Sequence, residues 1–211
     1  MVFANGGLKF TQVDKFNSQL VYAGGENGLF RSTDAGGTWF QIGAQFQTEM
    51  QGNLANMRPD IVPTYSEDGV SGIKAWQGVF EIQTDAFNAN WVYVTAYGTA
   101  KGLYRSKDAG VTWEKLLTDD YMRGVAITPD DSSVIYATAS ASYHSGANVD
   151  SSGIRVSHDE GVTWQSINNG MAWNYGGTIR TTTNNKVWAW SPGTGVQYLQ
   201  ADDYIFVNGF E

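Results

Sequence analysis

Ser-Thr-Asp-Ala-Gly-Gly-Thr-Trp, residues 32–39, follows a pattern that occurs three times in the chain. The pattern is Ser-X-Asp-X-Gly-X-Thr-Trp, and its positions are Ser32, Asp34, Gly36, Thr38 and Trp39; Ser106, Asp108, Gly110, Thr112 and Trp113; and Ser157, Asp159, Gly161, Thr163 and Trp164. A repeat of this kind indicates one supersecondary unit that is copied and stacked, because a single unit cannot bury its own apolar face. The sequence therefore predicts a stacked, modular fold.

Each copy lies in a longer module of short segments rich in Val, Ile, Tyr and Thr, bounded by Gly, Asn and Asp, as strands and turns require. We expect first strands at 9–14, 79–85, 124–130 and 177–183, second strands at 20–25, 91–97, 134–140 and 186–191, and third strands at 28–32, 102–106, 153–157 and 195–199. Short fourth strands are expected to begin at Trp39, Trp113 and Trp164.

Antiparallel four-stranded units that recur every roughly 40 to 50 residues are typical of β-propeller blades. We therefore predict an all-β protein, a β-propeller with about four blades in residues 1–201, whose fourth blade lacks the repeated turn. The long segment 43–78 separates the first two blades. No stretch shows the apolar period of an amphipathic helix.

Composition excludes several classes of function. The net charge of -8 and the scattered Lys and Arg residues argue against a nucleic-acid partner. The absence of Cys excludes disulfides, Cys-ligated zinc and thiol catalysis. No run approaches the roughly 18 apolar residues of a membrane helix, and residues 1–7 do not resemble a leader. We expect no cofactor, no metal and no membrane insertion.

The repeated turn has a structural interpretation. Its Asp can accept hydrogen bonds from backbone N–H groups, and its Gly allows the tight backbone turn. Its Trp begins the next strand and packs between sheets. A shared metal or acid site is not expected, because blades hold the three turns far apart.

The repeated motif resembles the Asp-box, or BNR repeat, of sialidases, sortilin-type propellers, photosystem II assembly factors and the family 74 xyloglucan-cleaving glycoside hydrolases. Residues 24–39, 98–113 and 191–199 are especially similar to the sortilin and xyloglucanase style of repeat. The resemblance implies a propeller that serves enzymes and binding proteins alike. The xyloglucanases and sortilin-type proteins that the chain resembles have seven or more blades, so we expect missing N-terminal blades or self-association to complete the ring. A self-closed four-bladed ring is the alternative.

The last ten residues, 202–211, depart from the blade pattern. They resemble short tails ending in Gly-Phe-Glu on exported proteins of some bacteria, which implies a secreted or periplasmic location. Alternatively, residues 204–207 form the closing strand of the last blade, and both interpretations can hold.

The long segments are expected on the face opposite the repeated turns, which makes that face the candidate site. Its candidate catalytic residues are Asp60, Glu67, Asp68 and Asp150, and its candidate ligand-binding residues are Trp76, Tyr97, Tyr143, His144, Trp173, Tyr175 and Trp190. Aromatic rings flanked by acids suit sugar rings. The alternatives are that Trp76, Trp173 and Trp190 pack between blades and that the acids are solvated.

Two functions fit these residues. The first is an exported binding or scaffold module that holds a polysaccharide or a protein segment. The alternative is a glycoside hydrolase, whose two carboxyl groups would lie roughly 6.5 to 9.5 Å apart for inversion or about 5 to 5.5 Å apart for retention. The arginine triad that a sialidase requires is not expected, because Arg31, Arg105 and Arg155 lie at matching places in the repeats and are interpreted as structural.

Overall fold

The structure is a computed structural model that describes residues 8–25, 28–46, 78–97, 100–119, 121–140, 152–171, 176–183, 186–191, 195–200 and 205–208. These residues form four antiparallel sheets of four strands each. Within each sheet the strands lie side by side in chain order. The predicted all-β fold of about four blades is therefore confirmed, and the sheets are called blades 1 to 4 below.

The strand bounds follow the repeat. Blade 1 contains β1 (Leu8–Val13), β2 (Val21–Gly25), β3 (Gly28–Ser32) and β4 (Phe40–Ile42), followed by the 3-10 helix η1 (Ala44–Phe46). Blade 2 contains β5 (Gly78–Thr84), β6 (Val92–Tyr97), β7 (Gly102–Ser106) and β8 (Glu114–Leu117). Blade 3 contains β9 (Met122–Thr128), β10 (Asp131–Ala139), β11 (Ile154–Ser157) and β12 (Gln165–Ser166). Blade 4 contains β13 (Ile179–Thr181), β14 (Val187–Ser191), β15 (Gly195–Gln200) and β16 (Ile205–Asn208).

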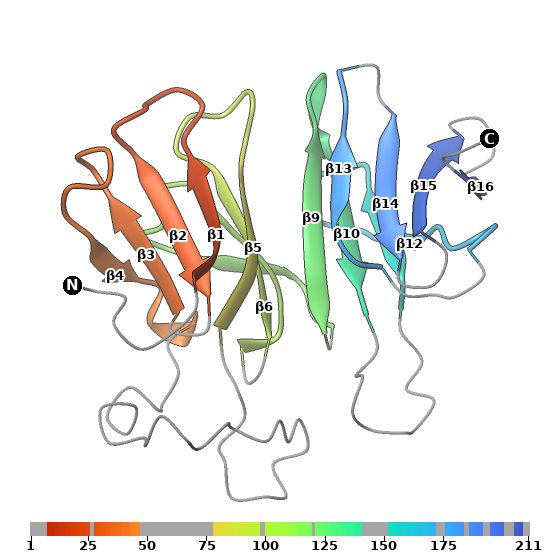
Figure 1. Ribbon diagram of the computed structural model, residues 1–211, viewed down its shortest axis with the longest axis horizontal. Helices are drawn as coiled ribbons and strands as arrows, with labels where there is room; N and C mark the ends of the chain where they lie inside the picture. Colours follow the sequence, from red (N-terminus) through yellow and green to blue (C-terminus); the bar gives the residue numbers. More distant parts are fainter. Residues whose placement is uncertain are drawn as a thin grey trace, which may run out of the picture.

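The blades follow one another along the molecule, with blade 1 at one end and blade 4 at the other (Figure 1). The turns that join the first and second strands lie at one end of the strands, at the top of Figure 1. Backbone bonds tie the repeated turns to the same end: Ala35 donates to the Gln19 carbonyl at 2.9 Å, and Ala109 donates to the Asn90 carbonyl at 2.8 Å. This end is called the Asp-turn face, and the other end is called the opposite face.

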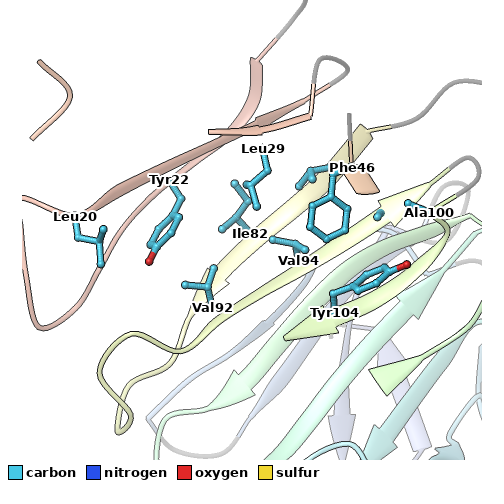
Figure 2. Close-up of a cluster of buried hydrophobic side chains, with 11 residues drawn as sticks. Leu20, Tyr22, Leu29, Phe46, Ile82, Val92, Val94, Ala100 and Tyr104 are labelled. Atoms are coloured by element: carbon cyan, nitrogen blue, oxygen red, sulfur yellow. The ribbon is translucent and has the colours of Figure 1, made fainter. Parts of the chain in front are cut away.

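Three apolar clusters fill the spaces between neighbouring blades, which we call the first, second and third interfaces. The first joins blades 1 and 2 through Leu20, Tyr22, Leu29, Phe46, Val79, Ile82, Val92, Val94, Ala96, Ala100 and Tyr104. Figure 2 shows side chains of the two blades pointing toward one another in this cluster. The second interface contains Tyr93, Leu103, Met122, Val125, Ile135, Ala137 and Ala139. The third contains Ala126, Tyr136, Ile154, Val156, Ile167, Ile179, Val187, Ala189 and Leu199.

A strand in the middle of the stack is covered on both faces, which explains its sequence. All five residues of β7 are buried: Leu103 packs in the second interface and Tyr104 in the first, while Arg105 and Ser106 form hydrogen bonds. Each fully buried Leu or Ile stabilises the stack by about 1.5–3 kcal/mol. Blade stacking is therefore driven mainly by these interfaces.

The stretch after residue 201 contains β16, which pairs with β15 from Gln197↔Asn208 to Gln200↔Ile205. This strand closes the sheet of blade 4, as one of the two interpretations of the tail expected. In the part of the chain that the structure describes, no helix is long and apolar enough to cross a membrane.

Candidate functional site

The three repeated turns, residues 32–39, 106–113 and 157–164, are called Asp turns. In the first, Asp34 Oδ1 accepts from the Ser32 hydroxyl and from the Thr38 backbone N–H, both at 2.7 Å, and Asp34 Oδ2 accepts from the Thr38 hydroxyl at 2.7 Å. Trp39 Nε1 donates to the Gly36 carbonyl at 3.0 Å. The other two turns repeat these bonds. Every Asp oxygen in these turns is therefore occupied by the turn itself.

The same bonds keep the three carboxylates charged. Bonds from Thr38 hold the pKa of Asp34 at about 2, and bonds from Thr163 do the same for Asp159. Burial alone would raise the pKa of Asp108, but the bonds from Thr112 and Ser106 outweigh it and hold this pKa at about 2 as well. A carboxylate with so low a pKa is a poor general acid or base near neutral pH. The expected structural role of the Asp turns agrees with this chemistry.

Arginines link the Asp turns to the preceding blade. Arg31 of blade 1 donates from Nη1 to the Ala109 carbonyl of blade 2 at 2.7 Å, and Arg105 of blade 2 donates from Nη1 to the Glu160 carbonyl of blade 3 at 3.0 Å. Arg105 also pairs with Glu114 at 2.7 Å. The polar link therefore always runs from one blade to the Asp turn of the next.

Arg155 does not occupy the matching place, which corrects one expectation. Arg31 and Arg105 stand opposite Tyr22 and Tyr93 in the sheets, whereas Arg155 stands opposite Ala137. Arg155 lies two positions before Ser157, whereas Arg31 lies one position before Ser32. Arg155 consequently points elsewhere and pairs with Asp119 at 3.1 Å.

Of the residues predicted for the opposite face, Trp190 is the one whose side chain the structure describes. Tyr97 is the last residue of β6. Trp190 lies near the end of β14, and its side chain is 48% exposed. A Cβ at Gly177 would lie 2.5 Å from the indole Cε3, so the ring covers backbone that only glycine leaves open. The remaining candidates lie outside the described residues: Asp60, Glu67, Asp68, Trp76, Tyr143, His144, Asp150, Trp173 and Tyr175.

A second group on the inner strands was missed by the sequence interpretation. The rings of Phe10 (β1) and Phe80 (β5) lie 5.6 Å apart, and the Arg123 guanidinium (β9) lies 4.5 Å from the Phe80 ring centre. Arg123 Nε also donates to the Ser140 hydroxyl at 2.7 Å. Three successive blades thus contribute to one row of aromatic rings and cationic charge, toward the opposite face. We call Phe10, Phe80 and Arg123 the inner row.

Next to Phe80 in β5, Glu81 is the buried half of an ion pair. Glu81 of β5 pairs with Arg180 of β13 and accepts from the Val125 backbone N–H at 3.3 Å and from Gln83 Nε2 at 3.1 Å. Glu81 is 1% exposed and Arg180 is 49% exposed. Burial raises the pKa of Glu81, and the Arg180 charge opposes that rise. The pair connects blades 2 and 4 across blade 3.

The described groups differ in the chemistry that they offer. The inner row offers flat rings and a guanidinium, which suit a sugar ring or an acidic group. Glu81 is paired with a cation rather than with a second carboxylate, so within the described ranges it does not form the acid pair of a glycosidase. No cluster of three or more His, Cys, Asp and Glu side chains within those ranges could hold a metal.

Comparison with solved structures gives the fold. The GH74 xyloglucanase from Xanthomonas campestris is similar with a TM-score of 0.63 and 13% identity, over 97% of this chain and 30% of that chain. The extracellular domain of BT4673 from B. thetaiotaomicron is similar with a TM-score of 0.61 and 13% identity, over 97% of this chain and 21% of that chain. A structure of YCF48 bound to D1 peptide is similar with a TM-score of 0.53 and 14% identity, over 96% and 53% of the respective chains.

The chain is therefore a β-propeller in fold, and it spans about a fifth to a half of the length of these similar proteins. At 13–14% identity, this structural similarity does not show a specific activity. No protein-family model and no curated protein matches the sequence.

Proposed function

We propose that this chain is part of an exported Asp-box propeller that works as a binding module and holds a polysaccharide on the opposite face. The observation that carries the proposal is the set of aromatic and cationic groups near that face, formed by the inner row and by half-exposed Trp190. Sugar rings stack their C–H faces on aromatic rings, and guanidinium groups donate to hydroxyl and carboxylate oxygens. On the Asp-turn face, the carboxylate oxygens of the Asp turns already accept hydrogen bonds from their own turns.

Affinity gel electrophoresis tests this proposal. Migration of the protein should be retarded by xyloglucan or by a related β-glucan, and Trp190→Ala should weaken binding by roughly tenfold because it removes a stacking surface. Arg123→Ala should weaken binding as well. Phe87→Ala is the matched control, since Phe87 is 51% exposed but follows Asp85 on the Asp-turn face. Absence of retardation by every glucan tested would count against a glucan ligand.

A protein segment is the second candidate ligand. The likeness to the YCF48 structure with its bound peptide favours it. An acidic segment would suit the Arg123 guanidinium, so its binding should weaken as salt rises, because screening shortens the reach of the charge.

Hydrolysis is the third candidate, and the likeness to the xyloglucanase favours it. If it is correct, the unmodified protein should release reducing sugar from xyloglucan, and activity should fall when Asp60, Glu67, Asp68 or Asp150 is changed to Ala. Binding without any release of reducing sugar would leave the binding module as the function of this chain.

A further inference from the structure

We infer that Arg123 is a receptor for a carboxylate group, so that the polysaccharide held on the opposite face contains uronic acid residues. This rests on the proposed function for the class of polymer. What is new is the selection of an acidic sugar, and the residue that makes it.

A backbone bulge recurs in the first strand of blades 1 to 3. The residues opposite the central tyrosines of the second strands are Gln12, Gln83 and Ala126. Three positions before each of them the register shifts, and the residues left without a partner across the ladder are Lys9 in β1, Phe80 in β5 and Arg123 in β9. Bulges re-aim a side chain and are common next to active sites. The same backbone feature therefore presents a different side chain in each blade.

Contacts from two blades fix the Arg123 guanidinium. Its Nε donates to the hydroxyl of Ser140, a residue that is 1% exposed, at 2.7 Å. Its central carbon lies 4.5 Å from the centre of the Phe80 ring in the preceding blade. Nη1 and Nη2 have no hydrogen-bond partner in the part of the chain that the structure describes. These two nitrogens form the edge with which arginine binds a carboxylate through two parallel bonds.

Arg123 differs in this respect from the other arginines of the described ranges. Arg105, Arg155 and Arg180 each pair with a carboxylate of the chain. Arg31 donates to a backbone carbonyl of the next blade. Among the described residues, Arg123 is the arginine with neither kind of partner, although the chain carries a net charge of -8. A carboxylate from outside the chain supplies the partner that it lacks.

The strands around Arg123 favour an acidic ligand. The charged residues of the first strands, β1, β5, β9 and β13, are Lys9, Glu81, Arg123 and Arg180. Glu81 is buried and paired with Arg180, so on these strands an acidic ligand meets no uncompensated carboxylate. The rings of Phe10 and Phe80, 5.6 Å apart, lie beside the guanidinium. A uronic acid offers both a C–H face for a ring and a carboxylate for the arginine.

A matched pair of oligosaccharides is the test. Cellohexaose and the hexamer of β-1,4-linked glucuronic acid differ only in the oxidation of carbon 6. In calorimetric titrations of the full chain at low salt, the acidic hexamer should bind at least about tenfold more tightly, because the guanidinium gains a charge-assisted bidentate bond. The methyl ester of the acidic hexamer should bind like cellohexaose. Added salt should reduce the preference, since screening weakens the attraction.

Three variants locate the preference. Arg123→Gln removes the charge but keeps an amide that donates to hydroxyl groups, so the two hexamers should bind equally and cellohexaose affinity should change by less than about threefold. Arg123→Lys keeps the charge without the fork and should retain part of the preference. Lys15→Gln is the matched control, because Lys15 is exposed and follows Asp14 on the Asp-turn face. It should leave the preference unchanged.

Each contrary result has a distinct meaning. Equal binding of the two hexamers by the unmodified protein would overturn the acidic sugar and leave the polysaccharide-binding proposal standing. Binding of neither hexamer would overturn both. An acid preference that persists in Arg123→Gln would refute the role of Arg123. Tighter binding of a poly-glutamate peptide than of the acidic hexamer would assign the guanidinium to a protein segment instead.

Discussion

The first two interfaces and the third are built differently. In the first two, an Asp turn receives an arginine from the preceding blade near the outer strands. Blade 4 has no Asp turn, and the third interface is linked through the inner strands, where Thr181 donates its hydroxyl to the Ile127 carbonyl at 2.8 Å and Thr138 donates to the Gly177 carbonyl. The Glu81 and Arg180 pair adds a link from blade 2 to blade 4.

This difference shows that apolar packing and polar links contribute separately to holding neighbouring blades together. All three interfaces contain a cluster of buried apolar side chains, with or without an Asp turn. Inner-strand polar links occur in all three interfaces, since Thr84 donates to the Val13 carbonyl at 3.4 Å and Thr95 donates to the Arg123 carbonyl at 3.1 Å. The arginine link to an Asp turn is therefore an additional link, at the outer strands, of the first two interfaces.

Arg180→Ala should have the largest effect. It leaves the buried Glu81 carboxylate without its cation, and breaking such a pair should lower the free energy of unfolding by about 3–5 kcal/mol at pH 8. Burial raises the pKa of Glu81 above its ordinary value of 4.5, so the folded protein holds the Glu81 proton more tightly than the unfolded chain does. The stability that this proton contributes is complete below pH 4.5 and is lost as pH rises through the raised pKa. The loss should therefore be smaller at pH 5. Urea unfolding at the two pH values measures it.

The control is the double variant Glu81→Gln with Arg180→Ala. It removes the buried charge together with its partner, so more than half of the lost stability should return. A single variant that is equally destabilising at pH 5 and pH 8 would contradict the role given to Glu81.

Gly110→Ala and Gly36→Ala form the next comparison. Both place a side chain at a positive φ, which costs about 1–2 kcal/mol. Gly110→Ala also forces a Cβ against Ile42, so its total cost should reach about 2–4 kcal/mol. Thermal unfolding followed by circular dichroism measures both. Equal losses would show that the Asp turn of blade 2 is not held against blade 1 as described.

The acid sensitivity of the Asp turns gives the smallest effect. The pKa of Asp34 is about 2 in the folded protein against an ordinary value of 3.8, so between these values the folded protein binds fewer protons than the unfolded chain. The stability from this carboxylate is complete above pH 3.8 and is lost as pH falls through about 2. Denaturant midpoints measured from pH 5 to pH 2 should fall less steeply for Asp34→Asn than for the unmodified protein. Identical slopes would refute this account.

The sequence predicts the repeated parts of the fold well. The expected third strands at 28–32 and 102–106 agree residue for residue with β3 and β7, because Gly opens each strand and the Asp turn closes it. Most other strands begin or end within one or two residues of their expected places. The bonds of the Asp turns also follow from the side-chain types that recur at fixed spacing.

The inner row and the ion pair could not be predicted in this way, because they are not repeated. The one local signal was Glu81 itself, a charged residue inside the apolar run of β5. A register shift between Val79 and Glu81 changes which side chains face inward, and no sequence pattern reveals it. Arg180 lies 99 positions further along the chain, so only the stacking of blades brings it to Glu81.

The arginine links also give the stack a direction. Each one runs forward along the chain, from the donor of one blade to the carbonyl of the next, and the donor and acceptor chemistry is the same at both steps. A gene segment encoding one whole blade could therefore be duplicated or lost between blades 1 and 3 with matching partners left on either side. Blade 4, which has neither the acceptor turn nor the donor arginine, would end such a series of exchanges.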